Sequence, residues 1–483
     1  MKHSVLLRRG VGCALGALAL GACSPKTAAV VTTAPAAATA TAAAVAPAAA
    51  PAGPAFQIPV EYYTLPNGLR VVLSPDHTAP TATVAAYYAV GFRTEPRNRT
   101  GFAHLFEHLM FQGSQNLGKA EFIGLIQKNG GAMNGSTRFD FTNYYEVVPS
   151  NKLETILWAE ADRMRGLAID QSNLTNQQGV VKSEVRVNVL NQPYGGFPWL
   201  DMPQKANKNW NNAHNFYGDL KDLDAANLAD TKDFFKTYYA PNNAVLAVVG
   251  DFEPAEAKAW VTKYYGNIPS ATPPPKPDLA EPRQEAEQRF TKDDKLAAKP
   301  ALAFAYHMPE RNTPEYYAMI LLDQILLQGN DSRLYQALVQ KRGYSDGVRG
   351  GINNDLGNQF NYAGPMLWMG SLTYDPAVQA DSVVHVLDRE VSRLTSKGID
   401  QATLDLAVVK MRSAFYDQVS GSTNFGRADL LAAFALFDND PARINKLEGE
   451  FRKVTPALLQ KTAQEYLRPT NRTLLIVNPL AKS

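Results

Sequence analysis

Two histidines and a glutamate lie close together in the segment Gly101-Phe-Ala-His-Leu-Phe-Glu-His-Leu-Met110. His104, Glu107 and His108 have the spacing H-x-x-E-H. In a helix, residues four apart lie on one face, so both imidazoles can bind a single Zn2+ ion. Glu107 borders that face, where its carboxylate can take a proton from a water molecule beside the metal. These residues predict a zinc site capable of metal-assisted hydrolysis.

The motif supplies only two ligands, whereas a catalytic zinc site uses three protein ligands and one open position. The segment from Ser172 to Arg186 has a polar start followed by apolar spacing consistent with a helix, and it contains Glu184. From its surroundings alone, Glu184 would be a solvated helix residue. The chain has only seven histidines, so chance is a poor explanation of H-x-x-E-H itself.

The chain resembles the family of pitrilysin, insulinase and mitochondrial processing peptidase, in which H-x-x-E-H is followed at a set distance by a glutamate ligand. Here Glu184 lies 76 residues after His108. The resemblance implies that His104, His108 and Glu184 hold one Zn2+ ion per chain, with Glu107 as general base. In relatives a further glutamate, seven residues before the third ligand, supports the site. Gln177 occupies that position here and removes a negative charge near the metal.

A glycine-rich segment, Gly130 to Thr137, resembles the family strand that runs beside the zinc. In relatives this strand offers backbone groups to an extended substrate, which is a form of strand addition. The resemblance implies substrate binding by Met133, Asn134, Gly135 and Ser136, with Gly135 in place of the usual alanine. Without the motif upstream, an ordinary glycine-rich turn that enters a strand is an alternative for this segment.

The C-terminal half departs from full-length relatives, which carry there an arginine and a tyrosine that stabilise the oxyanion. No arginine after residue 282 has a tyrosine at the family spacing of seven residues; Arg427 meets Phe434 instead, and its place near a helix start favours a structural role. The resemblance therefore implies a homodimer, or a heterodimer with a similar subunit that lacks the metal motif and supplies the Arg-Tyr pair.

An internal repeat predicts two similar domains. The segments Tyr238 to Gly250 and Tyr466 to Asn478, offset by 228 residues, both have a helix end, a turn with proline and asparagine, and an apolar strand. The predicted fold class is α+β, with each domain an open, mostly antiparallel sheet covered by helices. The resemblance implies that the two domains form half of a clam-shell chamber. The predicted limits are 57–268 for the zinc-bearing domain, 269–284 for a Pro-rich linker and 285–483 for the second domain.

Apolar periodicity predicts the main elements of both halves. The predicted strands are 68–73, 81–90, 143–149, 301–307 and about 362–374. The predicted helices are 101–112, 119–129, 151–167, 313–327, 378–394 and 401–418.

The N-terminus is typical of a bacterial lipoprotein. Basic residues precede an apolar run, Val11 to Leu20, that is too short to span a bilayer and indicates a signal peptide over residues 1–22. Leu20-Gly21-Ala22-Cys23 resembles a lipobox, in which Cys23 becomes the lipidated N-terminus. Residues 23–56, rich in alanine, proline and threonine, are a predicted tether. Ser24 favours the outer membrane, so the predicted location is the cell envelope, on its periplasmic side.

Composition narrows the function classes. With 48 basic and 46 acidic residues, the chain shows no nucleic-acid footprint. Its only cysteines, Cys13 and Cys23, leave the mature part without disulfides or a cysteine metal site. The predicted function is a zinc endopeptidase that acts on peptides or unfolded polypeptides. The alternatives are a non-catalytic assembly subunit and a zinc-binding envelope lipoprotein, for which Glu107 would be dispensable.

Overall fold

The computed structural model describes residues 57–421 and 423–480. The predicted signal peptide, the predicted lipidation site at Cys23 and the predicted tether lie outside these residues. Among the helices within them, none is both long enough and apolar enough to cross a membrane.

The first half builds a six-stranded sheet with the order β1-β2-β6-β3-β5-β4. Its neighbouring strands are antiparallel, except that β2 pairs in parallel with β6. The strands are β1 (Glu61–Thr64), β2 (Arg70–Pro75), β3 (Thr81–Tyr88), β4 (Ala132–Thr137), β5 (Thr142–Pro149) and β6 (Ala244–Gly250). The helices are α1 (Phe102–Leu109), α2 (Glu121–Lys128), α3 (Leu153–Arg165), α4 (Gln171–Val185), α5 (Asp201–Ala206), α6 (Trp210–Ala213), α7 (Leu220–Ala225), α8 (Leu228–Tyr238) and α9 (Pro254–Tyr265).

The second half builds a five-stranded sheet with the order β7-β11-β8-β10-β9. Only β7 and β11 are parallel. The strands are β7 (Gln288–Asp294), β8 (Ala301–His307), β9 (Arg349–Ile352), β10 (Leu367–Thr373) and β11 (Arg472–Pro479). The helices are α10 (Pro314–Leu326), α11 (Arg333–Tyr335), α12 (Ala380–Lys397), α13 (Gln401–Val419), α14 (Phe425–Asp438), α15 (Leu447–Arg452) and α16 (Pro456–Tyr466).

The two sheets share one topology. The order β2-β6-β3-β5-β4, with its single parallel pair, has the same pattern as β7-β11-β8-β10-β9. The closing strands β6 and β11 are the two segments of the sequence repeat, and they hold the same place in their sheets. The predicted α+β class with two similar open sheets is confirmed. The edge strand β4 therefore has a counterpart in the edge strand β9.

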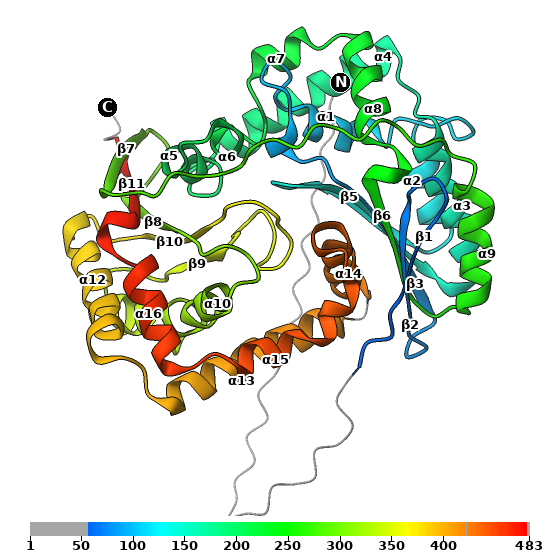
Figure 1. The fold of residues 1–483 in the computed structure, drawn as a ribbon. Helices are drawn as coiled ribbons and strands as arrows, with labels where there is room; N and C mark the ends of the chain where they lie inside the picture. The colour runs from blue at the N-terminus through cyan, green and yellow to red at the C-terminus, as the bar shows by residue number, and fades with distance from the viewer. Residues whose placement is uncertain (1–56, 422, 481–483) are drawn as a thin grey trace, which may run out of the picture. The chain divides into compact units, whose positions relative to one another are not determined.

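Each sheet buries both faces, and one face of each is covered by the other half (Figure 1). In the first sheet, alternate residues such as Val71 and Val84 pack against α1, α3 and α9, whereas Val72 and Tyr87 join a core that contains Phe434 of α14. This alternation follows the period of two of a strand. Conversely, α5 of the first half packs on β8 and β11 of the second sheet. The halves are therefore interlocked.

Most of the predicted elements occur, with ends displaced by a few residues. The predicted helix 101–112 is α1, and it begins after Gly101 because that residue has φ +82°, outside the helical region. The predicted strand 362–374 is shorter, as β10, because only Leu367–Thr373 pair with β8. The predicted domain limits stay predictions, although each sheet lies within one of the two predicted domains.

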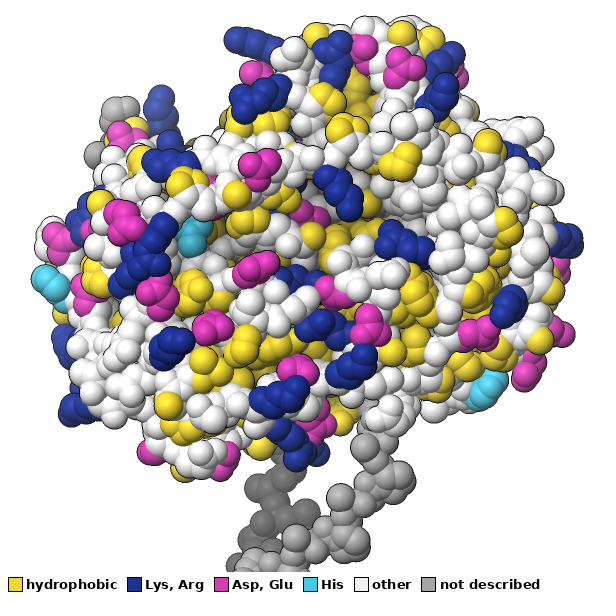
Figure 2. Space-filling model, viewed as in Figure 1, with side chains coloured by type: hydrophobic (Ala, Val, Ile, Leu, Met, Phe, Trp, Pro, Cys, Tyr) yellow, Lys and Arg dark blue, Asp and Glu magenta, His cyan; other side chains and the backbone are white. Residues whose placement is uncertain are grey.

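Basic and acidic side chains are interspersed over the face shown in Figure 2. This distribution accords with the near balance of 48 basic and 46 acidic residues in the chain. Hydrophobic side chains are visible in the hollow of the same face (Figure 2).

Candidate metal centre

Helix α1 places the two motif histidines on consecutive turns. Their Nε2 atoms lie 3.3 Å apart. The start of the helix is fixed by Gly101, since a Cβ atom there would lie 2.4 Å from the carbonyl oxygen of Tyr217. His104 is buried and lines the cavity described below, whereas His108 is half-buried.

Helix α4 brings the third predicted ligand to the histidines. Its first turn is capped by Asp170, whose side chain accepts a hydrogen bond from the backbone N–H of Asn173. Near the other end, Glu184 places Oε2 3.2 Å from Nε2 of His108 and Oε1 3.7 Å from Nε2 of His104. One ligand atom from each residue lies within 4.8 Å of the other two. Right after α4 the chain forms a π-helical turn, Arg186–Leu190, a feature common beside functional sites.

These three side chains fit a small tetrahedral ion. In a tetrahedral zinc site with bonds of about 2.1 Å, neighbouring ligand atoms are about 3.4 Å apart. Here the two Nε2 atoms are 3.3 Å apart, and the two carboxylate oxygens of Glu184 lie 3.2 Å from His108 and 3.7 Å from His104. Two imidazoles and one carboxylate also match the donor types that zinc accepts at hydrolytic sites. The chemistry and spacing of the set therefore suit Zn2+.

The protonation states favour metal binding as well. Burial, aided by repulsion from His108, lowers the pKa of His104 to about 3, so its ring stays neutral. Burial alone would raise the pKa of Glu184, but hydrogen bonding to His108 and the nearby histidine charges lower it overall. A neutral imidazole and an ionised carboxylate are the forms that bind a metal ion.

Glu107 lies next to this group but does not belong to it. Burial raises the pKa of its carboxyl group, while a hydrogen bond to Thr137 and the charges of His108 and Arg138 oppose the rise. A raised pKa brings a carboxylate closer to the range in which it can accept and return a proton at neutral pH.

The predicted substrate strand is β4, an edge strand that pairs only with β5. Gly135 and Ser136 line the cavity that contains the candidate ligands, whereas Met133 and Asn134 lie outside its lining. A Cβ atom on Gly135 would approach Cγ of Glu107 to 3.3 Å and Cδ1 of Tyr144 to 3.2 Å. The missing side chain thus leaves room beside the predicted base, which is a reason for glycine that the sequence did not reveal.

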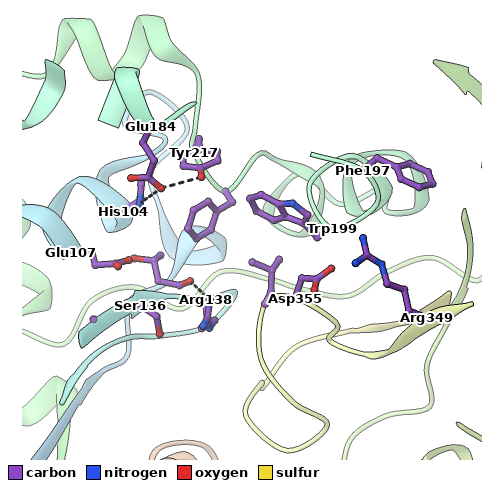
Figure 3. Close-up of a pocket in the computed structure, with 14 residues that line it drawn as sticks. His104, Glu107, Ser136, Arg138, Glu184, Phe197, Trp199, Tyr217, Arg349 and Asp355 are labelled. Carbon is purple, nitrogen blue, oxygen red and sulfur yellow. Dashed lines mark hydrogen bonds and ion pairs between the residues drawn. The ribbon is translucent and has the colours of Figure 1, made fainter. Parts of the chain in front are cut away.

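The cavity has a volume of about 540 Å3 and two facing walls. One wall holds His104, Glu107 and Glu184, and the other includes residues of the second half (Figure 3). Those residues are Arg349 on β9 with Asp355 and Leu356 in the following loop. Sequence reasoning missed them, although the internal repeat offered a signal: β9 is the counterpart of the strand already chosen for substrate binding.

Two other residues with structural roles at the site were also missed. The hydroxyl of Tyr217 donates a hydrogen bond to Oε1 of Glu184 at 3.1 Å (Figure 3). The buried carboxylate of Glu95 accepts hydrogen bonds from the backbone N–H groups of Gly101 at 2.8 Å and Ala103 at 2.7 Å, where α1 begins. Tyr217 is 33 residues from Glu184 in the sequence, and Glu95 lies before the H-x-x-E-H motif. No sequence motif links either residue to the site.

Gln177 and Arg427 have contacts with residues other than the candidate ligands. The buried Gln177 donates a hydrogen bond to Oδ1 of Asn176, and the structure gives it no hydrogen bond to a candidate ligand among the described residues. Arg427 forms an ion pair with Asp76 at 2.7 Å and lines a different cavity, which accords with the structural role predicted for it.

The profile described as Insulinase (Peptidase family M16) matches residues 70–195, and the profile described as Peptidase M16 inactive domain matches residues 225–411. The zinc protease PqqE of Helicobacter pylori is 25% identical over 429 residues, which cover 87% of this chain and 93% of that protein. The mitochondrial-processing peptidase subunit beta of Saccharomyces cerevisiae is 24% identical over 371 residues, covering 74% and 78% of the two chains.

Solved structures have the same fold. The crystal structure of a protease from Helicobacter pylori aligns with a TM-score of 0.80 at 25% identity and covers 87% of this chain and 100% of the other. The periplasmic protease PqqL from Escherichia coli aligns with a TM-score of 0.71 at 16% identity, but this chain matches only 48% of it. With both profiles in sequence order and the shared fold, the chain belongs to peptidase family M16, the insulinase family.

Proposed function

We propose that this chain is a zinc-dependent endopeptidase that hydrolyses peptides or unfolded polypeptides. The observation that carries the proposal is the convergence of His104, His108 and Glu184 beside a cavity that His104 and Glu184 line and that the edge strand β4 borders. The names of relatives such as the zinc protease PqqE support it.

In this proposal, His104, His108 and Glu184 hold the metal, and a bound Zn2+ ion supplies the Lewis acidity that activates water and polarises the peptide carbonyl. Glu107 accepts the proton of the attacking water at its carboxylate and later returns it to the nitrogen of the departing amine. The elevated pKa of Glu107 suits a group that must be ionised before attack and protonated after it.

Substrate would bind as an added strand along β4. The unpaired edge of this strand offers backbone groups to an extended peptide, while Gly135 and Ser136 border the cavity. Backbone pairing reads no particular side chain, which suits an enzyme for unfolded chains.

The variant Glu107→Gln tests the proposal. The amide keeps the size of the side chain but cannot accept a proton, so kcat should fall by about 100-fold or more. Zinc content should stay at one ion per chain, because Glu107 is not a proposed ligand. Peptide hydrolysis and metal content are measured on the same preparations, with Glu256→Gln, an exposed position on α9, as the matched control.

The same experiment separates the rival functions. Zinc binding without hydrolysis in the wild type, alone and with its partner, would favour a zinc-binding lipoprotein. Neither zinc nor hydrolysis would favour a non-catalytic assembly subunit. Wild-type turnover in Glu107→Gln would assign the base to another residue.

We also propose that the chain works as a pair that encloses a chamber, either with itself or with a similar subunit that supplies an Arg-Tyr pair. The periplasmic protease PqqL supports this, since this chain matches 48% of that longer protein. One chain of PqqL is therefore about as long as two copies of this one.

For the location, we propose attachment to the outer membrane by a lipid group on Cys23. The support is the lipobox-like sequence Leu20-Gly21-Ala22-Cys23 together with the relative named as a periplasmic protease.

A further inference from the structure

An arginine of the second half faces the candidate metal centre across the cavity. Arg349 is the first residue of β9, the counterpart of the predicted substrate strand β4. It lines the same cavity as His104 and Glu184 but lies on the far side from them, near Phe197 and Trp199 (Figure 3).

The guanidinium of Arg349 lacks a carboxylate partner. The structure gives it no ion pair within residues 57–421 and 423–480, whereas the buried Arg93, Arg163 and Arg427 each form one. Asp355 lies on the same wall, but its Oδ2 accepts a hydrogen bond from Nδ2 of Asn354 at 2.7 Å and it forms no ion pair with Arg349. A positive charge in the cavity is therefore left available to a ligand.

Arg349 is an exposed residue, and Phe197 and Trp199 form an aromatic part of the cavity lining on the same side (Figure 3). Its guanidinium is therefore accessible to a ligand that enters the cavity.

A second guanidinium lies at the end of β4. Arg138 lines the cavity, and the only hydrogen bond of its guanidinium among the described residues is a long one, 3.4 Å, to the carbonyl oxygen of Thr137. It also has no ion pair among the described residues. Arg138 of the first half and Arg349 of the second half thus both line one cavity.

We propose that Arg349 forms a subsite for a substrate carboxylate, with Arg138 on the first-half side of the same cavity. The planar guanidinium binds a carboxylate through two parallel hydrogen bonds, which an amide cannot reproduce. The chain therefore prefers peptides that carry an acidic residue, or their own C-terminal carboxylate, at a set distance from the cleaved bond. This inference rests on the proposed peptidase function and adds a substrate class to it.

The test is a cycle that changes enzyme and substrate together. One peptide series has a single Glu or its isostere Gln at each position in turn, with an amidated C-terminus. A second series has no acidic residue and ends in either a free acid or an amide. Each is assayed with wild type, with Arg349→Gln and with Arg342→Gln, an exposed arginine of the same half that lies outside the cavity lining.

Wild type should show a kcat/KM about 10-fold higher for the acid than for its neutral partner at one position. Arg349→Gln should abolish that ratio while leaving kcat/KM for the neutral peptide within about 2-fold, because the change removes one charge-assisted contact. Arg342→Gln should keep the wild-type ratio. The first series identifies a side-chain carboxylate and the second a C-terminal carboxylate.

A binding measurement keeps this inference separate from the proposed function. Fluorescence anisotropy with Glu107→Gln protein gives Kd for the same peptides, and Arg349→Gln introduced in that background should raise Kd for the acidic peptide alone. Charge-dependent binding with no hydrolysis by wild type would sink the peptidase but keep the subsite. Hydrolysis with equal kcat/KM for acidic and neutral peptides at every position would overturn the subsite and leave the peptidase intact.

Discussion

His104 and His108 need only one helical turn between them to meet at a metal ion. Their Nε2 atoms are 3.3 Å apart, about the separation of two ligands on one tetrahedral zinc ion. Burial lowers the pKa of His104 to about 3, so protons do not compete for its ring near neutral pH. The two imidazoles are thus preorganised for metal binding.

Removal of either histidine should release the metal. His104→Ala or His108→Ala leaves two ligands, which cannot close a three-ligand site, so most of the zinc should be lost. Metal analysis after dialysis against a weak chelator measures this. His385→Ala, an exposed histidine on α12, should retain the full zinc content. Full retention in both ligand variants would refute the assignment.

At the scale of elements, helix α1 holds His104, Glu107 and His108, but its N-cap residue supplies no side-chain cap. Its N-cap residue, Gly101, has no side chain to accept a hydrogen bond from the first turn. Glu95 supplies the acceptor instead, through its two hydrogen bonds to Gly101 and Ala103, and His214 lies 3.4 Å from the same carboxylate. Glu95 therefore positions the helix on which His104 lies.

Substitution of Glu95 should weaken metal binding without removing a ligand. Glu95→Ala leaves buried N–H groups without an acceptor, so we expect a loss of about 1–3 kcal/mol in unfolding free energy. Zinc affinity should fall about 10-fold, as for other residues that support metal ligands. Glu95→Gln keeps an acceptor oxygen and should lose less of both.

Denaturant unfolding and chelator competition measure the two effects of Glu95. Glu256→Ala, an exposed glutamate on α9, should change neither quantity. If Glu95→Ala binds zinc as tightly as wild type, the position of α1 is set by packing alone and Glu95 has no part in it.

The whole molecule combines two halves that interlock but differ in chemistry. Helix α14 of the second half covers one face of the first sheet, where the hydroxyl of Tyr87 donates a hydrogen bond to Oδ1 of Asp429 at 2.8 Å. Helix α5 covers a face of the second sheet in return. This arrangement holds Arg349 opposite the candidate ligands, but the second half, after residue 282, has no Arg-Tyr pair at the family spacing.

The isolated chain should consequently be a poor peptidase. The developing oxyanion needs a positioned donor, and loss of one such donor typically costs about 100- to 1000-fold in rate. A companion subunit with the Arg-Tyr pair should restore activity, and mutation of the companion's arginine should abolish the gain without loss of zinc. Full activity of a purified chain shown to be monomeric would instead point to a donor within the chain itself.

Membrane attachment should depend on one residue. If Cys23 is lipidated, wild-type protein should sediment with membranes, whereas Cys23→Ala should be released or left unprocessed. Cell fractionation with mass analysis of the N-terminus measures both. Retention of a fully processed Cys23→Ala protein on membranes would mean that something other than lipid holds it.

The sequence by itself determined the parts that depend on local spacing. H-x-x-E-H places two imidazoles on one helix face whatever the rest of the chain does, because the helical period sets their distance. Period-two apolar segments likewise predicted β3, β5 and β8, and the repeat predicted two similar sheets. Glu184 required more than local spacing, since its link to His108 came from a family resemblance rather than from its surroundings.

Only the tertiary structure decided what faces the site and what supports it. Glu95, Tyr217 and Arg349 are brought to α1 and the cavity by chain reversals that no local period encodes. The room that Gly135 leaves for Glu107 depends on a contact between β4 and α1. The packing of α14 on the first sheet and of α5 on the second sheet could not be predicted for the same reason. An apolar face shows that a helix is buried, but the shape of the whole fold decides which sheet covers it.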